Sequence, residues 1–269
     1  MIYNVLEEDF GNNLVSNWKN LKVVKDFSSI SDSDLMISVG DVLKESVRIR
    51  LNNASPTLFV HRGYLGNHLY KTRKWWRYSI NGFANTRLLD IPHSRWPLLN
   101  LPKHPWKVKE VKNVLIVTSK MTAPIWDPHQ EYEWANNLLD KFPGADVRIR
   151  YKASKAGLRW ATLWDDFDWA DLVIGQASAA TVEAFWYGKK VISLFPCPTW
   201  AAGCDSTLEN WQDPTEPVLR DQWHEHIAWC QFTNEEWHTS EAEELINKYI
   251  GPIDLYKPGH LYNLKIIRS

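Results

Sequence analysis

The stretch from Asp168 to Leu194, DWADLVIGQASAATVEAFWYGKKVISL, constrains the fold more than any other part of this chain. Its apolar run 172–174 predicts a short buried strand, which the letters GQAS interrupt. Residues 179–187 have helix-forming composition without proline, Gly188 is a natural helix end, and 191–194 resumes a strand. Strand, loop, helix and strand in this order predict a βαβ unit of a parallel sheet.

The junction between that loop and its helix predicts an anion site. Ser178 is a good N-cap, and the free backbone N–H groups at a helix N-terminus attract anions. Glu183 follows about one turn later, where its carboxylate suits a neutral polar group such as a ribose diol. The pattern therefore indicates a nucleotide or nucleotide-sugar site. An ordinary βαβ unit with a solvated Glu183 is the alternative.

The segments before this stretch predict more α/β structure. Residues 114–117 predict a buried strand, 130–142 a helix and 145–151 an alternating strand. In the first half, residues 34–40 and 57–60 predict strands that run into the loops VGD and HRGYLG. Open α/β sheets bind ligands at the carboxyl ends of their strands, so these loops are candidate site segments.

A proline-rich connector divides the chain. Its prolines, between Pro92 and Pro105, predict an extended linker, which gives an N-terminal unit 1–105 and a C-terminal unit 106–269. Near the end, residues 234–250 predict one amphipathic helix.

Composition excludes several classes of protein. The chain has 269 residues with 31 basic and 32 acidic side chains, so net charge indicates no partner. Three cysteines without CxxC spacing argue against a disulfide scaffold, and neither a signal peptide nor a long apolar run is present. We expect a cytoplasmic protein without a membrane partner. The absence of Walker, G-x-S-x-G and GxGxxG motifs argues against kinase, hydrolase and dehydrogenase activity.

Basic charge is concentrated between residues 61 and 112, with 11 Lys and Arg against two acids and with four interleaved tryptophans. This mixture fits nucleic acid, whose phosphates bind cations and whose bases stack on aromatic rings. A solvated basic surface whose tryptophans point inward is the alternative. The expected nucleic-acid contacts are Arg62, Arg73, Lys74, Trp75, Trp76 and Arg77.

The motif G-x-x-S-x-x-x-x-E-A-x-x-x-G-K-x-V-I-S, which starts at Gly175, resembles that of the GT-B glycosyltransferases. The resemblance implies an α/β protein with two Rossmann-like domains whose parallel sheets face each other across a cleft. The C-terminal domain would hold a nucleotide-sugar, a co-substrate rather than a cofactor. By this resemblance Ser178, Ala179 and Ala180 contact phosphate, and Glu183 binds the ribose.

The first half has a second likeness. HRGYLG, WRYSINGFANT and SRW are similar to segments of bacteriophage proteins and polysaccharide-type transferases. This implies an acceptor-binding N-terminal domain, and hydroxymethylated pyrimidine in phage DNA is the favoured acceptor. A polysaccharide or small glycan is the alternative acceptor. A non-catalytic module of the same fold that binds nucleotide or nucleic acid is a further alternative.

Sugar transfer needs charge neutralisation at the leaving diphosphate and usually a base for the acceptor hydroxyl. Lys152 at a strand end, with Ser119 and Lys120 in the loop one strand earlier, are the candidate donor contacts. His61 and Asp41 end their strands and are the candidate bases. Two D-x-D pairs have the spacing of a transferase metal site but do not follow a strand as that role requires, and the His-Glu-His segment 224–226 matches no established zinc spacing, so no metal is expected.

Overall fold

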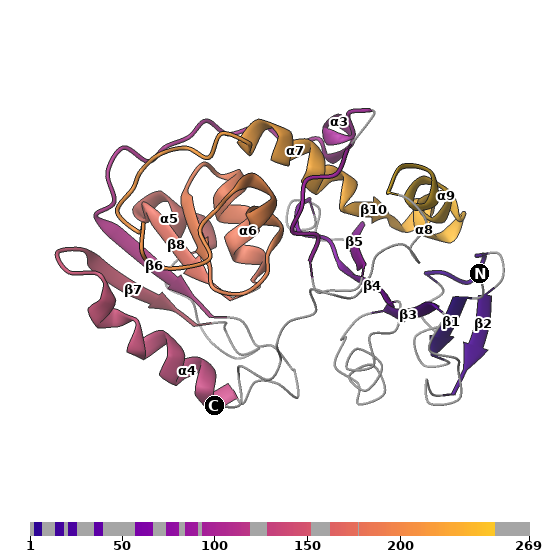
Figure 1. Cartoon of the computed structure of the whole chain (residues 1–269), viewed down its shortest axis with the longest axis horizontal. Helices are drawn as coiled ribbons and strands as arrows, with labels where there is room; N and C mark the ends of the chain where they lie inside the picture. The colour runs from indigo at the N-terminus through magenta and orange to yellow at the C-terminus, as the bar shows by residue number, and fades with distance from the viewer. Residues whose placement is uncertain are drawn as a thin grey trace.

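The computed structural model shows an α/β protein with two sheets (Figure 1). It describes residues 3–6, 14–18, 21–25, 35–39, 57–66, 74–80, 84–90, 93–118, 128–151, 162–176 and 178–250. The α/β prediction is therefore confirmed for these residues.

The second half of the chain builds a four-stranded parallel sheet of order β7-β6-β8-β9. Its strands are β6 (Asn113–Val117), β7 (Asp146–Arg150), β8 (Leu172–Gly175) and β9 (Lys190–Ser193). The helical elements along it are α4 (Pro128–Asn137), η1 (Leu139–Lys141), α5 (Leu163–Trp169) and α6 (Ala179–Trp186). The strands expected here from the sequence and the helix over 179–187 are confirmed, whereas the helix expected over 130–142 divides into α4 and the 3-10 turn η1.

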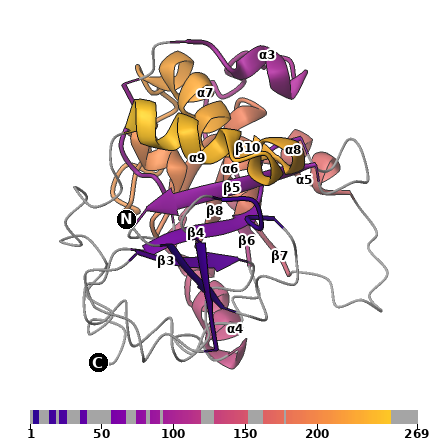
Figure 2. The same ribbon diagram turned by 90° about the vertical axis from the view of Figure 1, so that its right-hand side faces the viewer.

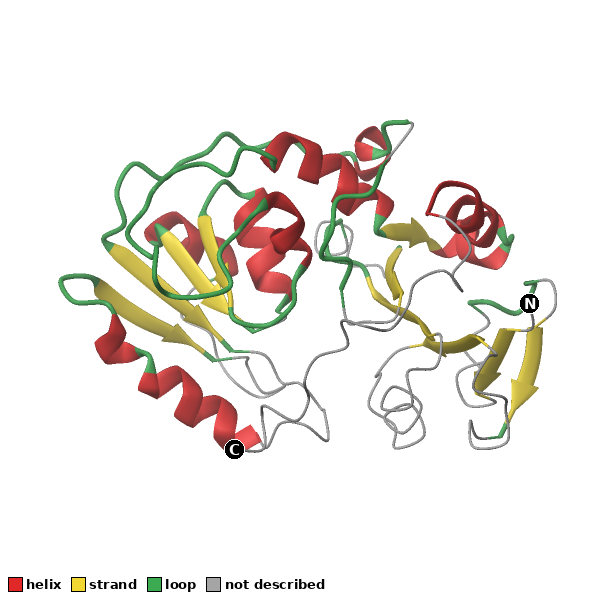
Figure 3. Ribbon diagram, in the orientation of Figure 1, coloured by secondary structure: helices red, strands yellow, loops and turns green. Residues whose placement is uncertain are grey.

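Side-chain alternation divides this sheet between two cores. Leu115 and Val173 pack with Phe185 of α6, whereas Val114 and Ile174 face the other way, into the core that contains the end of α4. Figure 3 shows α4 on one side of the sheet and α5 and α6 on the other. Both faces of each central strand are buried, which is why these strands have nearly continuous apolar sequences.

Five strands of the first half and β10 (Gln231–Thr233), near the other end of the chain, build the first sheet, of order β10-β5-β4-β3-β1-β2. This sheet is mixed, which corrects the expectation of two parallel sheets. Four strands are parallel to one another: β1 (Tyr3–Leu6), β2 (Leu21–Val24), β3 (Leu35–Val39) and β4 (Thr57–Arg62). Strand β5 (Trp75–Ile80) is antiparallel to β4. In both sheets the parallel strands follow the same order, with the first strand between the second and third in sequence.

The C-terminal segment returns to the first sheet. Helix α7 (Arg220–Trp229) is followed by β10 (Gln231–Thr233), which pairs antiparallel with β5 (Figure 2). Trp223 of α7 lies in the same core as α6, whereas Phe232 of β10 lies in the core of the first sheet. This segment therefore ties the two sheets together.

The sequence predicted an extended proline-rich connector, but the connector is not extended throughout. It contains a one-turn helix, α3 (Trp96–Leu99), with Pro97 near its start. A Glu225 carboxylate oxygen accepts the backbone N–H groups of Arg95 and Trp96 at 3.2 and 3.3 Å. The partner that stabilises this turn comes from α7, far along the chain, so local sequence could not reveal it.

The predicted single helix over 234–250 is also corrected. The segment divides into α8 (Asn234–His238), α9 (Glu241–Leu245) and the π-helical turn η3 (Ile246–Ile250). Ser240 separates α8 from α9 with a φ of 68°. Its hydroxyl donates a hydrogen bond to the Asn17 carbonyl at 2.9 Å, and this tertiary contact helps to hold the break.

Candidate functional site

The carboxyl edge of the four-stranded sheet forms the first part of the candidate site. From β6 the chain continues to β7 on one side, and after β7 it crosses to β8 on the other side of β6. The order of the strands therefore reverses between β6 and β8. Open α/β sheets bind ligands outside such a switch point. Val117 and Gly175 are register partners at this edge, so the loops that follow them flank the switch point.

Gly175 brings the start of α6 close to the strand ends. A Cβ at this position would lie 2.6 Å from Thr181 Cγ2 and 2.9 Å from Val117 Cγ2. Any larger residue would push α6 away from the sheet. The glycine of the motif is therefore required by close packing between helix and strand.

Ser178 is the N-cap of α6, as predicted. Its Oγ accepts the backbone N–H of Ala180 at 3.2 Å, and its carbonyl accepts the N–H of Thr181 at 3.1 Å. An anion that binds the Ala180 N–H would have to replace the serine hydroxyl. Ala179 is exposed and Ala180 is half-buried, so the first turn lies at the surface. Phosphate contacts at these residues stay a prediction.

Glu183 is buried, with 2% of its surface exposed. The alternative of an ordinary βαβ unit with a solvated glutamate therefore does not hold. Burial of a carboxylate is costly unless hydrogen bonds or charges compensate it, so a specific environment must hold this side chain. Binding of a ribose by Glu183 stays a prediction.

The second part of the candidate site lies on one face of the six-stranded sheet. His61 of β4 pairs in register with Arg77 of β5, and Arg77 pairs with Gln231 of β10. Directly paired residues share one sheet face, so these three side chains form a row across three strands. His61 and Arg77 are half-buried, and Gln231 is fully buried.

The segment Gly63–Gly66, which we call the GYLG loop, folds over the same face. Gln231 Oε1 accepts the backbone N–H groups of Tyr64 and Leu65 at 2.8 and 3.2 Å, and its Nε2 donates to the Leu65 carbonyl. A Cβ on Gly63 or Gly66 would lie 2.8 Å from Trp75. The two glycines therefore let the loop lie directly on Trp75.

Tyr64 connects the two parts of the site. Its ring packs in the core that also contains Val182 of α6 and Cys197, and the Cys197 sulfur lies 3.4 Å from Thr181 Oγ1. On the other side, the Arg77 guanidinium stacks on the Tyr64 ring at 4.2 Å. Burial raises the pKa of the Tyr64 hydroxyl, and the positive charge of Arg77 opposes this rise.

The expected nucleic-acid contacts do not share one surface. Alternation along β5 directs Trp75 and Arg77 to one face and Trp76 to the other. Trp75 is buried under the GYLG loop, and the Trp76 indole donates to Asn234 Oδ1. These two tryptophans match the alternative in which they point inward. Lys74 and Arg62 are exposed.

Five predicted site residues lie outside the described residues: Asp41, Arg73, Ser119, Lys120 and Lys152. Their roles stay predictions. Strand β7, which precedes Lys152, carries Arg150, and its guanidinium forms an ion pair with Asp166 of α5. That arginine is therefore engaged within the fold.

His226 of the His-Glu-His segment is a structural residue. Its Nε2 lies 3.0 Å from the Asn85 carbonyl, and its Nδ1 lies 3.3 Å from the Leu89 nitrogen. Across the described ranges, no three His, Cys, Asp or Glu side chains gather as metal ligands would. Within the same ranges, no helix has the length and apolar composition needed to cross a membrane.

Sequence reasoning did not single out Tyr64 or Gln231. Tyr64 belongs to the HRGYLG segment, but a tyrosine in a loop has no distinctive pattern. Gln231 reaches the site only because β10 returns to β5. A long-range strand pairing of this kind leaves no local signal.

No protein family model and no curated protein sequence matches the chain. Two solved structures of Thermosulfurimonas dismutans KpsC are similar to it. One, described as a beta Kdo 2,4 transferase, has a TM-score of 0.46 and 14% identity over 84% of this chain and 90% of that chain. The other, described as a beta Kdo 2,7 transferase, has a TM-score of 0.47 and 10% identity over 91% and 99%. At these TM-scores the likeness assigns neither a family nor an activity.

Proposed function

We propose that this protein is a glycosyltransferase that moves a sugar from a nucleotide-sugar to a hydroxyl acceptor. The observation that carries the proposal is the start of α6 at the switch point, with a capping Ser178 and a buried Glu183 one turn later. A helix N-terminus stabilises a leaving diphosphate, and a buried carboxylate suits a ribose diol.

We assign the donor to residues 106–269 and the acceptor to residues 1–105, in a GT-B arrangement with a cleft between two domains. The GYLG loop lies at the junction of these two units, because it carries residues of the first half into the core that contains α6. His61 lies in the row beside Arg77, and we propose it as the base for the acceptor hydroxyl. Asp41 remains a second candidate for this role.

A glycan is the acceptor that we favour over DNA. Acceptor recognition on DNA needs cations along a phosphate backbone and exposed rings for bases. Among the described residues, Trp75 is buried and Trp76 lies on the opposite face of β5, which removes most of the support for a DNA track. The KpsC structures are described as sugar transferases, which agrees with the reaction class but is not needed for it.

Calorimetric titration with a panel of nucleotide-sugars tests the donor site. We expect one of them to bind and Glu183→Gln to weaken that binding about 10-fold, since a charged hydrogen bond contributes about 1.5–3 kcal/mol. Glu209→Gln, at an exposed glutamate of the same half, is the matched control. Unchanged affinity in Glu183→Gln would remove the ribose role.

Acceptor assays test the reaction itself. Glycans, hydroxymethylated DNA and plain DNA are incubated with the bound donor, and sugar transfer is followed by mass spectrometry. Transfer to a glycan supports the proposal, and transfer only to hydroxymethylated DNA restores the DNA acceptor. Donor binding without transfer or slow hydrolysis would favour a non-catalytic binding module.

A further inference from the structure

We propose that Arg77 and the GYLG loop form a subsite for one acidic group, a carboxylate or a phosphate, on the sugar substrate. Its assignment to a sugar rests on the proposed function, whereas the anion site itself rests on the side chains described below. The proposal replaces the expected contact of Arg77 with a nucleic-acid backbone.

Arg77 differs from three other arginines that are not fully exposed. The buried Arg95 and Arg220 and the half-buried Arg150 each lie within ion-pair distance of a carboxylate. Arg77 is half-buried, and no carboxylate of the described residues pairs with its guanidinium. A half-buried arginine that lacks a carboxylate partner among the described residues gains strongly from an anion, because its planar N–H groups match a carboxylate or phosphate.

The guanidinium is also held in place. It stacks on the Tyr64 ring at 4.2 Å, and Gln231 fixes the backbone beneath that ring through the N–H groups of Tyr64 and Leu65. Stacking on an aromatic face leaves the edge of the guanidinium available for a bidentate ligand. This side chain is therefore organised before a ligand arrives.

The Tyr64 hydroxyl is a second sign of a ligand. Tyr64 is 3% exposed, and its hydroxyl makes no hydrogen bond of normal geometry with the described residues, although Arg77 is close enough to lower its pKa. Such a buried donor is uncommon in native structures and points to an acceptor that arrives with a ligand. An anion beside Arg77 can accept this hydrogen bond after a small adjustment of the loop.

The surroundings favour a single acidic group over a polyanion. The neighbours of Arg77 on its face of β5 are Trp75 and Ser79, both neutral, and His61 is its partner on β4. Lys74 precedes the strand and is exposed. One guanidinium with a histidine beside it suits one carboxylate or phosphate, whereas a nucleic-acid backbone needs a track of cations.

Binding of three related sugars tests the subsite. D-glucuronate, D-glucose 6-phosphate and D-glucose carry a carboxylate, a phosphate and no charge. We expect one or both acidic sugars to bind to the wild-type protein in calorimetry and D-glucose to bind at least 10-fold more weakly. Arg77→Gln should weaken binding of the acidic sugar about 10- to 100-fold, and Arg77→Lys should restore part of it. Arg87→Gln, at an exposed arginine, should bind like the wild type.

Tyr64→Phe keeps the ring under Arg77 and removes only the hydroxyl, so it tests the subsite even if Arg77→Gln does not fold. We expect it to weaken binding of the acidic sugar several-fold. Equal binding of all three sugars, no binding of either acidic sugar, or wild-type affinity in a folded Arg77→Gln variant overturns the proposal.

Failure of the proposed function would be recognised separately. Glu183→Gln should leave binding of the acidic sugar unchanged, and Arg77→Gln should leave binding of free nucleoside diphosphates unchanged. If no sugar transfer is found but the acidic sugar binds through Arg77, the subsite stands without the transferase. If transfer occurs and Arg77→Gln has no effect on affinity or KM, only the subsite fails.

Discussion

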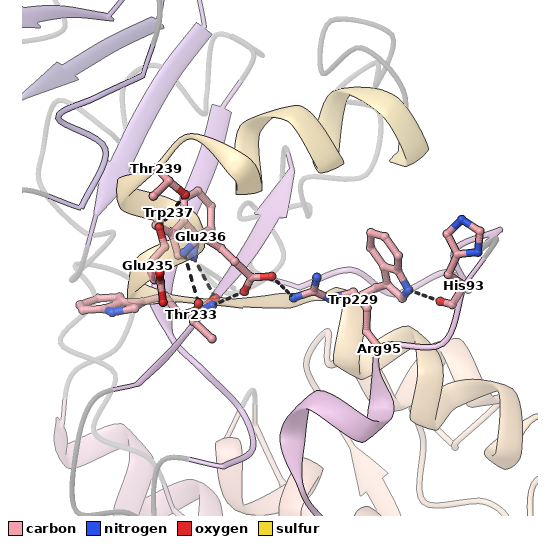
Figure 4. A network of polar contacts seen from close by, with 9 residues as sticks. His93, Arg95, Trp229, Thr233, Glu235, Glu236, Trp237 and Thr239 are labelled. Carbon is pink, nitrogen blue, oxygen red and sulfur yellow. Dashed lines mark hydrogen bonds and ion pairs between the residues drawn. The ribbon is translucent and has the colours of Figure 1, made fainter.

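The Arg95 guanidinium donates a hydrogen bond to the Glu236 carboxylate across 2.6 Å, which joins the connector before α3 to α8 (Figure 4). Both side chains are nearly buried, and the guanidinium also lies over the rings of Trp229 and Phe232. Removal of one partner leaves an uncompensated buried charge. We therefore expect Glu236→Gln to lower the free energy of unfolding by about 3 kcal/mol, measured by urea denaturation.

Glu235→Gln is the matched control for this ion pair, because Glu235 is exposed and precedes Glu236 in α8. Its effect should stay within about 0.5 kcal/mol. The double variant Arg95→Met with Glu236→Gln should recover part of the loss, since no charge is then buried alone. A single Glu236→Gln variant as stable as the control would show that the pair does not stabilise the fold.

Gly188 ends α6 with a φ of 89°, and a Cβ there would lie 2.1 Å from the Pro105 carbonyl oxygen. Gly144 has a similar φ of 82° but no atom within 4 Å of such a Cβ. Gly144→Ala should therefore cost only the backbone strain, about 1–2 kcal/mol. Gly188→Ala should lower the free energy of unfolding considerably more, because the connector must also move. Equal losses in the two variants would mean that the contact with Pro105 is unimportant.

The two buried histidines of α7 predict a loss of stability in acid. Burial lowers the pKa of both His224 and His226 from 6.5 to about 4, and Arg220 and Lys103 add to the effect at His224. The unfolded chain binds protons near pH 6.5 that the folded protein excludes. Their contribution is therefore complete above pH 6.5 and is lost as the pH falls toward about 4. We expect on the order of 2–3 kcal/mol for each ring.

Urea unfolding at several pH values between neutrality and pH 4 measures this loss. His224→Leu removes one of the two titrating rings, so the free energy of unfolding should depend less steeply on pH. The free energy of unfolding at neutral pH should change less than this pH dependence does. Neither nitrogen of His224 has a hydrogen-bond partner among the described residues, which makes leucine a tolerable replacement. An unchanged slope in this variant would show that His224 is not the titrating group.

Ser178→Ala should separate the stability of α6 from ligand binding. Loss of the cap removes the acceptor for the Ala180 N–H and should cost about 1 kcal/mol in unfolding free energy. Thr162→Ala, at the N-cap of α5, provides a comparison with a similar cost. If the hydroxyl contacts the donor phosphate, only Ser178→Ala should also weaken nucleotide-sugar binding. Equal donor affinity in both variants would confine Ser178 to capping.

The sequence predicted those parts of the fold that local patterns determine. Strands β6 and β8 are continuous apolar runs, and Gly188 ends α6 as expected. The N-cap at Ser178 was predicted because the hydroxyl and the N–H that it accepts lie two residues apart. These features need no information about the rest of the chain.

Features that depend on distant partners escaped prediction. Helix α3 forms within a connector expected to be extended, because Glu225 caps it from α7. The break at Ser240 depends on Asn17, near the other end of the chain. The row of His61, Arg77 and Gln231 required strand register, which composition cannot supply. The concentration of basic residues in the sequence placed Arg77 in one group with Lys74 and Trp76. In a strand, however, adjacent side chains point to opposite faces of the sheet.

The pairing of β10 with β5 has a consequence for how this chain is synthesised. During translation, the ribosome produces β5 long before β10, so the first sheet keeps an open antiparallel edge while the whole second sheet emerges. An unpaired edge strand is a template for intermolecular pairing. A fragment that stops at Pro105 would keep that edge permanently and would also lack Gln231 beneath the GYLG loop. We therefore expect nascent chains of this protein to depend on chaperone protection, or on rapid completion, more than a pair of independently folding halves would.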